Sequence, residues 1–316
     1  MEQLTFLELA KLLISFAVLA PSGHNSQPWN FQVSDNKIII TPDYSKCLNV
    51  VDKENRELFI SLGCAVKNLQ TAARHYGYDC SYIYEDGKII VTLSKQDVCK
   101  DDILFAAIEK RHTHRGNFTG EKIPDTLLQG FENEENASVL IFSAESHQAG
   151  IIKQKIVEGN EIQMSDTAFK NELTSWMRFN QKHINETHNG LCYNVLGFPP
   201  TPKAIGKKII GMFLNPKAQN KTDNAVNNSA SNFCVFSVKE NSEKNWIDLG
   251  VFLEGFLLKI TSEGLAYNFC NQPCEIEPLN RSLKQELGIN GFPSVIIRLG
   301  YGKAAKNFAP REEVKL

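Results

Sequence analysis

The sequence lacks the features that mark several common classes of protein. None of its apolar runs approaches the ~20 residues that a membrane-spanning helix needs. Its first predicted helix has no basic start and no cleavage site, so we expect no secretion signal. No Gly-x-Gly-x-x-Gly segment follows a predicted strand, which argues against a Rossmann dinucleotide-binding domain.

Charge of one sign is not in excess either. The chain has 34 Lys and Arg residues against 36 Asp and Glu residues, and this balance suggests neither nucleic acid nor a membrane surface as a partner. The eight cysteines are scattered and form no Cys-x-x-Cys pair, so we interpret them as reduced thiols of a cytoplasmic protein. His112 and His114 have no pattern of carboxylate or cysteine ligands around them, so we expect no metal.

The 316 residues, of which 42% are apolar, suffice for one large domain or two of ordinary size. Apolar periodicity predicts long helices at 52–76 and 246–262, hairpins at 30–41 and 80–93, and strands at 138–143, 231–238 and 293–299. We expect one polar helix over 168–184, and we expect the Asn-rich segment 217–229 to be mobile. Together these elements predict a mixed α+β sandwich.

Small polar side chains are concentrated in residues 20–31, which read A-P-S-G-H-N-S-Q-P-W-N-F. Pro21 and Gly23 end the preceding helix and open a turn. The side chains that follow carry donors and acceptors spaced along an extended backbone, so several can meet the edge of one planar heterocycle. The alternative is a surface turn rich in Asn, Ser and Pro.

A second segment, Arg111 to Arg115, places two guanidinium groups and the hydroxyl of Thr113 at the end of a predicted helix. The fork of an arginine side chain matches phosphate oxygens and stays charged at neutral pH. This pattern favours a phosphate site, and an exposed basic patch is the alternative.

Both segments resemble motifs of the nitroreductase superfamily, and most closely those of its Acg-like branch. The first is similar to the P-S-x-x-N-x-Q-P-W loop, and the second to the R-x-S/T-x-R element. The resemblance implies an FMN cofactor, with contacts to the ring and to the phosphate and ribityl chain from Ser22, Gly23, His24, Asn25, Gln27, Arg111, His112, Thr113 and Arg115. It implies that the amides of Asn25 and Gln27 face the cofactor rather than the protein core.

Two segments near the end of the sequence extend this resemblance. Residues 310–314 are similar to the family's terminal segment, which implies that Arg311 also meets the phosphate. Residues 271–276 are similar to the P-x-E segment that lies over the flavin ring, which implies contacts from Gln272, Glu275 and Ile276.

The distribution of these motifs suggests a fused pair of units. Residues 1–100 contain the first loop and lack the basic element, whereas residues 101–316 contain the basic element and lack a second loop. Each subunit of a dimeric nitroreductase carries both motifs, so we infer an internally duplicated pseudo-dimer with one flavin site between its halves. It would be a monomer or a homodimer. Residues 190–206, rich in Gly, Pro and apolar side chains, are expected to form a lid over FMN, or else a surface loop packed on a helix.

The resemblance implies an oxidoreductase in which NAD(P)H reduces FMN and the flavin reduces a nitroaromatic, quinone or similar small-molecule acceptor. The flavin carries the chemistry at N5, so no catalytic side chain is expected. The alternative is a non-enzymatic protein that sequesters or stores FMN, and a flavin-free structural relic is a third possibility.

Overall fold

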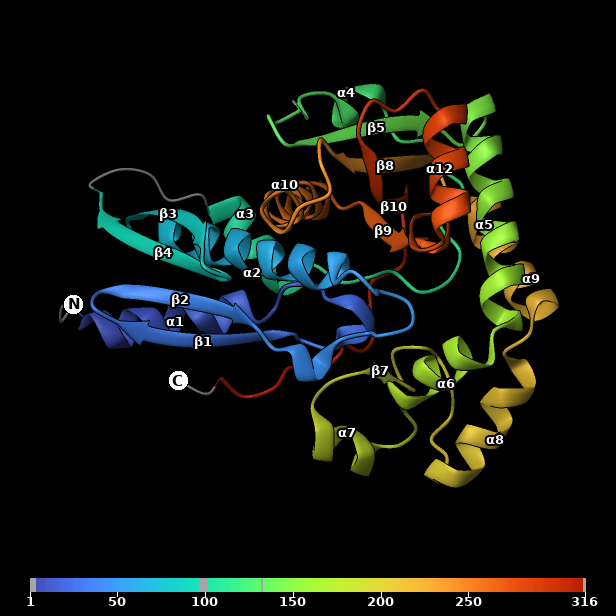
Figure 1. Ribbon diagram of the computed structural model, residues 1–316, viewed down its shortest axis with the longest axis horizontal. Helices are drawn as coiled ribbons and strands as arrows, with labels where there is room; N and C mark the ends of the chain where they lie inside the picture. The colour runs from blue at the N-terminus through green and yellow to red at the C-terminus, as the bar shows by residue number, and fades with distance from the viewer. Residues whose placement is uncertain (1–3, 97–101, 132, 315–316) are drawn as a thin grey trace.

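The computed structural model describes residues 4–96, 102–131 and 133–314. Two antiparallel sheets lie on either side of a pair of long helices, α2 (Arg56–His75) and α10 (Glu243–Ser262), as Figure 1 shows. The mixed α+β class predicted from the sequence is confirmed. The internal duplication stays a prediction.

The first sheet consists of two hairpins, in the order β1-β2-β4-β3. Its strands are β1 (Trp29–Ser34), β2 (Lys37–Pro42), β3 (Tyr78–Glu85) and β4 (Lys88–Lys95). Both central residues of each turn have positive φ, 48° and 57° at Asp35 and Asn36, and 49° and 72° at Asp86 and Gly87. This is the geometry of the two-residue turns that match strand twist, so both predicted hairpins are confirmed.

The second sheet has the order β5-β8-β10-β9 and is covered on both faces. Its strands are β5 (Ala137–Ser143), β8 (Asn232–Val238), β9 (Ala266–Phe269) and β10 (Phe292–Gly300). Phe236 and Ile297 belong to the main core together with α10, whereas Phe233 and Ile296 pack with α5 (His147–Ser165) and α12 (Glu277–Glu286). Alternate residues of one strand thus serve two cores.

The remaining short elements connect or flank these layers. They are α1 (Phe6–Ala17), η1 (Gly23–Asn25), η2 (Tyr44–Lys46), α3 (Asp102–Lys110), α4 (Asp125–Leu128) and α11 (Gln272–Glu275). None of the helices in the described part of the chain has the length and apolar character to cross a membrane.

Residues 167–213 leave the second sheet and form a separate layer next to the first hairpin and the tail of the chain, and residues 216–229 return to pack on α5 (Figure 1). The elements are α6 (Thr167–Ser175), β6 (Met177–Arg178), α7 (Gln181–Thr187), β7 (Leu191–Cys192), α8 (Lys203–Phe213) and α9 (Pro216–Ser229). Two expectations were wrong here. The predicted helix 168–184 is interrupted by β6, which pairs with β7.

The segment 217–229, which was expected to be mobile, lies in helix α9. Asn215 caps α9, since its side-chain oxygen accepts a hydrogen bond from the amide of Ala218. The buried Asp223 of α9 forms an ion pair of 2.7 Å with the buried Arg298 of β10. This buried ion pair holds the Asn-rich helix α9 against the second sheet.

The contact between α2 and α10 depends on two glycines. A Cβ added to Gly63 would lie 2.0 Å from the carbonyl oxygen of Ile247 and 2.8 Å from the Cα of Gly250. Real side chains do not approach that closely, so the two backbones meet directly at this point.

We predict that Gly63→Ala will destabilise the protein by about 1–3 kcal/mol or more, because the helices must move apart. The matched control is Gly150→Ala in α5, where an added Cβ meets nothing within 4 Å. That variant is expected to gain about 0.5–1 kcal/mol, since alanine favours a helix. Urea unfolding measures both changes, and equal effects at the two positions would contradict the direct backbone contact.

Candidate functional site

The loop that joins α1 to β1, residues 20–28, has an unusual backbone. His24, Asn25 and Gln27 have φ values of 50°, 55° and 56°, in the left-handed region that side chains disfavour. Such strain costs of order 1–3 kcal/mol per residue and persists only where the surroundings enforce it. One enforcing contact is local, because the amide of Gln27 donates to the Ser22 hydroxyl at 3.0 Å.

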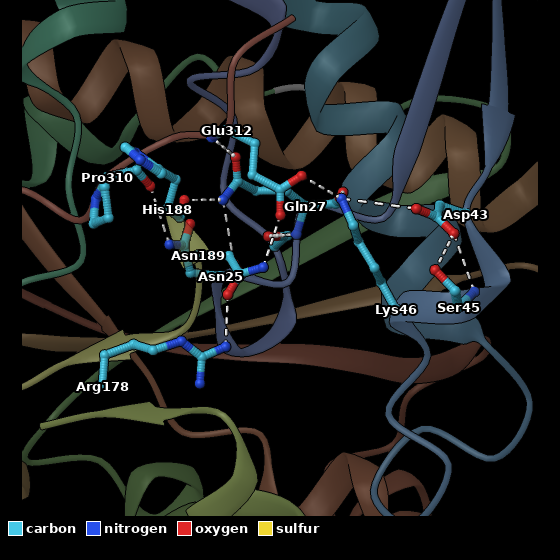
Figure 2. Close-up of polar contacts among 11 residues, drawn as sticks. Asn25, Gln27, Asp43, Ser45, Lys46, Arg178, His188, Asn189, Pro310 and Glu312 are labelled. Atoms are coloured by element: carbon cyan, nitrogen blue, oxygen red, sulfur yellow. Dashed lines mark hydrogen bonds and ion pairs between the residues drawn. The ribbon is translucent and has the colours of Figure 1, made fainter. Parts of the chain in front are cut away.

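Two distant segments also hold loop 20–28 (Figure 2). The side-chain amide of Asn25 donates to the carbonyls of Gly190 at 3.3 Å and Pro310 at 3.2 Å. The side-chain amide of Gln27 donates to the His188 carbonyl at 3.0 Å, and its oxygen accepts from the amide of Glu312 at 2.9 Å. Loop 20–28 is therefore joined to residues 188–190 and to residues 310–312.

The expected orientation of the Gln27 amide is wrong in this structure. Its side chain is 1% exposed, and both ends of the amide are bonded to protein atoms. No local pattern in the sequence indicates these partners, which lie more than 160 residues away. Whether Gln27 contributes to cofactor binding stays a prediction.

An ion pair completes this arrangement. Lys46 lies 2.7 Å from the carboxylate of Glu312 and donates to the Gln27 carbonyl at 3.1 Å. The other oxygen of Glu312 accepts from Asn189 at 2.7 Å, and Asn189 in turn accepts from Arg178 (Figure 2). Glu312 therefore links loop 20–28 to the 188–190 segment.

Arg111 is buried and its donors already have protein partners. Its Nε lies 3.0 Å from Glu254, its Nη1 donates to the Tyr267 hydroxyl at 2.6 Å, and its Nη2 donates to the Leu19 carbonyl at 2.6 Å. Burial raises the pKa of Glu254 to about 7, and the charge of Arg111 opposes that shift. Glu254 is fully buried within α10, and sequence analysis missed it; an acid inside an apolar helix was the available signal.

Arg311 and Arg111 both donate hydrogen bonds to the Leu19 carbonyl. It donates to Leu19 at 3.1 Å and to Val18 at 2.8 Å, and also to the side-chain oxygen of Asn25 at 2.9 Å. Burial lowers the pKa of Arg311 to about 10, and the neighbouring Arg111 adds to this. Both arginines lie at the carboxyl end of α1, where positive charge is favoured. They were expected to meet a flavin phosphate, but here they donate to protein atoms, and their contact with a phosphate stays a prediction.

Arg115 differs from both of these arginines. Its side chain is exposed to water and forms no ion pair with any described residue. The pKa of Arg115 is nevertheless lowered by surrounding protein, and Arg298 adds to the effect over an opposing contribution from Tyr267. Arg115 is therefore an exposed cation with protein close around it.

His24, from loop 20–28, lies close to Arg115. Burial lowers the pKa of His24 to about 4, and the charge of Arg115 lowers it further. Thr113 lies beside them, with its backbone bridged to Tyr267 and its hydroxyl bonded to the Tyr267 side chain. His112 lies further out, against the ring of Phe308. The structure thus brings His24, Thr113 and Arg115 together.

The segment 271–276 contributes a pair of carboxyl groups. Glu275 and Glu57 are hydrogen-bonded to each other, and the side-chain amide of Asn271 donates to Glu57 at 3.2 Å. Burial, and then Glu275, raises the pKa of Glu57 to about 8. A Cβ added to Gly23 would lie 3.2 Å from the Glu57 carboxyl, so this pair lies directly against loop 20–28.

The other two predicted residues of this segment lie to either side of the carboxyl pair. Gln272 donates to Asn160 of α5 at 3.0 Å, while its own side-chain oxygen is buried without a partner. Ile276 is half-buried between α11 and α12. Among the described residues, no group of three or more His, Cys, Asp or Glu side chains could hold a metal ion.

Comparison with known proteins gives two full-length relatives. No family model matches the chain. Two proteins of Mycobacterium tuberculosis, from strains CDC 1551 and H37Rv, are each named "Putative NAD(P)H nitroreductase". Each is 24% identical over 309 residues, which covers 93% of this chain and 85% of the relative. These relatives support the class predicted from the motifs, the nitroreductase superfamily. The Acg-like branch stays a prediction.

Solved structures of similar proteins are more distant. An FMN and NADPH-dependent nitroreductase, NfnB from a Sphingopyxis strain, has a TM-score of 0.43 at 15% identity, covering 66% of this chain and 95% of its own. A "putative nitroreductase" from Anabaena variabilis has a TM-score of 0.49 at 9% identity, covering 94% of this chain and 74% of its own. At these scores the likeness carries no argument for the site.

We predict that Gln27→Ala will lower the free energy of unfolding by about 1–3 kcal/mol, because it removes a buried amide and leaves the His188 carbonyl and the Glu312 amide without this partner. Gln32→Ala, at an exposed position of β1, is the control and should change stability little. Urea unfolding measures both. If Gln27→Ala proves as mild as the control, the contacts to 188–190 and 310–312 do not hold the loop.

We also predict that Glu57→Gln will change how stability depends on pH. Because the folded-state pKa of Glu57 is raised from 4.5 to about 8, the native protein holds a proton that the unfolded chain releases, and its stability falls as pH rises through this window. Glutamine cannot ionise, so the variant should gain stability relative to the native protein between pH 5 and pH 8. Melting temperatures across this range test the sign, with the exposed Glu121→Gln as control.

Proposed function

We propose that this protein is an FMN-dependent NAD(P)H oxidoreductase whose flavin lies where loop 20–28 meets the Arg111–Arg115 segment. The observation that carries the proposal is that His24, Thr113 and Arg115 lie close together. These residues come from the two motifs that resemble nitroreductases, and they are separated by about ninety positions in the sequence. The names of the two mycobacterial relatives support the same activity.

The donors present fit a flavin phosphate or the electron-rich edge of its ring. Arg115 is a cation in a partly desolvated position with no carboxylate partner among the described residues. Such a charge is costly unless an anion joins it. Arg111 and Arg311 donate to protein atoms, so they would act by fixing the end of α1 and loop 20–28.

When bound, FMN would supply the hydride chemistry, and the chain would bind, orient and shield it. Thr113 and Arg115 would hold the anionic part, and loop 20–28 with residues 271–276 would line the ring. The Glu57–Glu275 pair would hold one proton beside the loop at neutral pH. A nitroaromatic, quinone or similar compound would be the electron acceptor.

A second function, sequestration of FMN without turnover, is favoured by one observation. Residues 188–190 are hydrogen-bonded to loop 20–28 at both Asn25 and Gln27, so they restrict access to it. In the expected lid that follows, residues 190–206, Phe198 is 49% exposed and Tyr193 is half-buried, which leaves Tyr193 as the candidate for contact with the ring. Deleting residues 192–202 should then accelerate flavin reduction.

The absorption spectrum of purified protein loaded with FMN distinguishes these functions. Bleaching of the flavin band on addition of NADH or NADPH supports the oxidoreductase. A band that persists with either nucleotide supports sequestration. Protein that cannot be loaded with FMN would refute both.

We predict that Arg115→Gln will weaken FMN binding about 10- to 100-fold, as expected for one charged hydrogen bond of ~1.5–3 kcal/mol. Arg281→Gln, which changes an exposed arginine of α12, is the control and should leave the affinity unchanged. Calorimetry with FMN and riboflavin measures both variants. A larger loss for FMN than for riboflavin assigns Arg115 to the phosphate, and an unchanged FMN affinity would remove Arg115 from the site.

A further inference from the structure

One stretch of the chain has a strongly one-sided charge that the overall balance conceals. Between Glu186 and Asp223 there is no acidic residue, and the stretch contains Lys203, Lys207, Lys208, Lys217 and Lys221. All five lysines are exposed. The net charge of the whole chain is -2, so this is a local basic surface on a slightly acidic protein.

Helix α8, Lys203–Phe213, lies in the middle of this stretch and has two apolar faces. One face packs inward: Gly206 and Ile210 are buried against Phe179 and its neighbours. The other face points to solvent. On it Ile205 is 54% exposed, Ile209 36%, Met212 64% and Phe213 64%.

The exposed apolar side chains form a continuous strip. Ile205, Ile209 and Met212 are separated by four and three positions, so they lie along one side of the helix. Four apolar side chains on one short helix exceed the scattered exposure that soluble surfaces usually show. In Figure 1, α8 lies at the outer edge of the molecule, away from both sheets. The strip has no partner within the described part of the chain.

We propose that α8 binds the surface of an anionic lipid bilayer, with its exposed apolar strip at the level of the acyl chains and its lysines at the headgroup phosphates. A helix that combines an exposed apolar face with lysines and lacks acids is typical of interfacial membrane binding. The proposal does not depend on the flavin. It differs from the expectation that the balanced net charge excludes a membrane surface as a partner. Net charge sums over the whole molecule, so it does not reveal a local basic surface.

The charge distribution favours a bilayer over a second copy of this chain. A symmetric contact through α8 would bring the lysines of two copies together, and like charges in one interface are costly. The groups facing this region reinforce its positive potential. Burial lowers the pKa of His183 on α7, and Lys203, Arg178 and Lys207 lower it further, against an opposing contribution from Glu186.

Sedimentation with lipid vesicles tests the proposal. The full chain is expected to bind vesicles of phosphatidylcholine with about 30% phosphatidylserine, and to bind vesicles of pure phosphatidylcholine much more weakly. Raising the salt concentration from about 0.1 M to about 1 M should weaken the binding, because salt screens exposed charges.

Two variants separate the charged and apolar contributions. The triple variant K203Q/K207Q/K208Q should reduce binding by about fivefold per lysine removed. The double variant M212S/F213S should reduce binding while keeping the lysines. The charge-matched control is K11Q/K37Q/K88Q, which changes three exposed lysines remote from α8 in sequence. Circular dichroism melting verifies that each variant is folded.

Three outcomes would overturn the proposal. The first is that the native protein binds neither kind of vesicle. The second is that the control loses as much binding as the α8 lysine variant, which would show a general charge effect. The third is a dimer in sedimentation equilibrium that M212S/F213S abolishes, together with no vesicle binding, which would assign the strip to a second copy.

Discussion

The direct contact of two helix backbones at Gly63 and Gly250 positions most of the molecule. Helix α2 packs on the first sheet and α10 on the second, so the distance between these helices sets the distance between the sheets. The same two helices carry the acids of the candidate site. Glu57 is in the first turn of α2, and Glu254 is one turn beyond Gly250 on α10. A change in how α2 and α10 cross would therefore move both acids: Glu254, the partner of Arg111, and Glu57, the partner of Glu275.

The cationic side chains of this structure occupy three different environments. Some are paired with protein atoms, one is available to a ligand, and others lie outside the candidate site. Arg111 and Arg311 neutralise the carbonyls at the end of α1, with Glu254 as an additional buried partner. Arg115 has no such carboxylate among the described residues, so it is the cation available to a ligand. The lysines of α8 are exposed and lie outside this site. A net charge close to zero thus conceals two local concentrations of positive charge.

The sequence predicted what depends on local patterns. Alternation and turn residues located both hairpins, and the apolar repeat located α2 and α10. It could not predict what depends on distant partners. Helix α9 is stabilised by its Asn215 cap and by Arg298. The Gln27 side chain points inward because its amide donates to the His188 carbonyl and accepts from the Glu312 amide. The motifs named segments that the structure brings together, but no motif included Glu254, which pairs with Arg111.

The hydrogen bond between Gln27 and Glu312 spans 285 positions of the chain, and this separation bears on the order of folding. A nascent chain emerging from the ribosome presents loop 20–28 long before residues 310–312 exist. Until then the left-handed residues of the loop lack one of the segments that hold them. Contacts so remote in sequence form late, because the entropy of closing a long loop must be overcome first. The hairpins can fold during synthesis, whereas the loop is completed only once translation has passed residue 312.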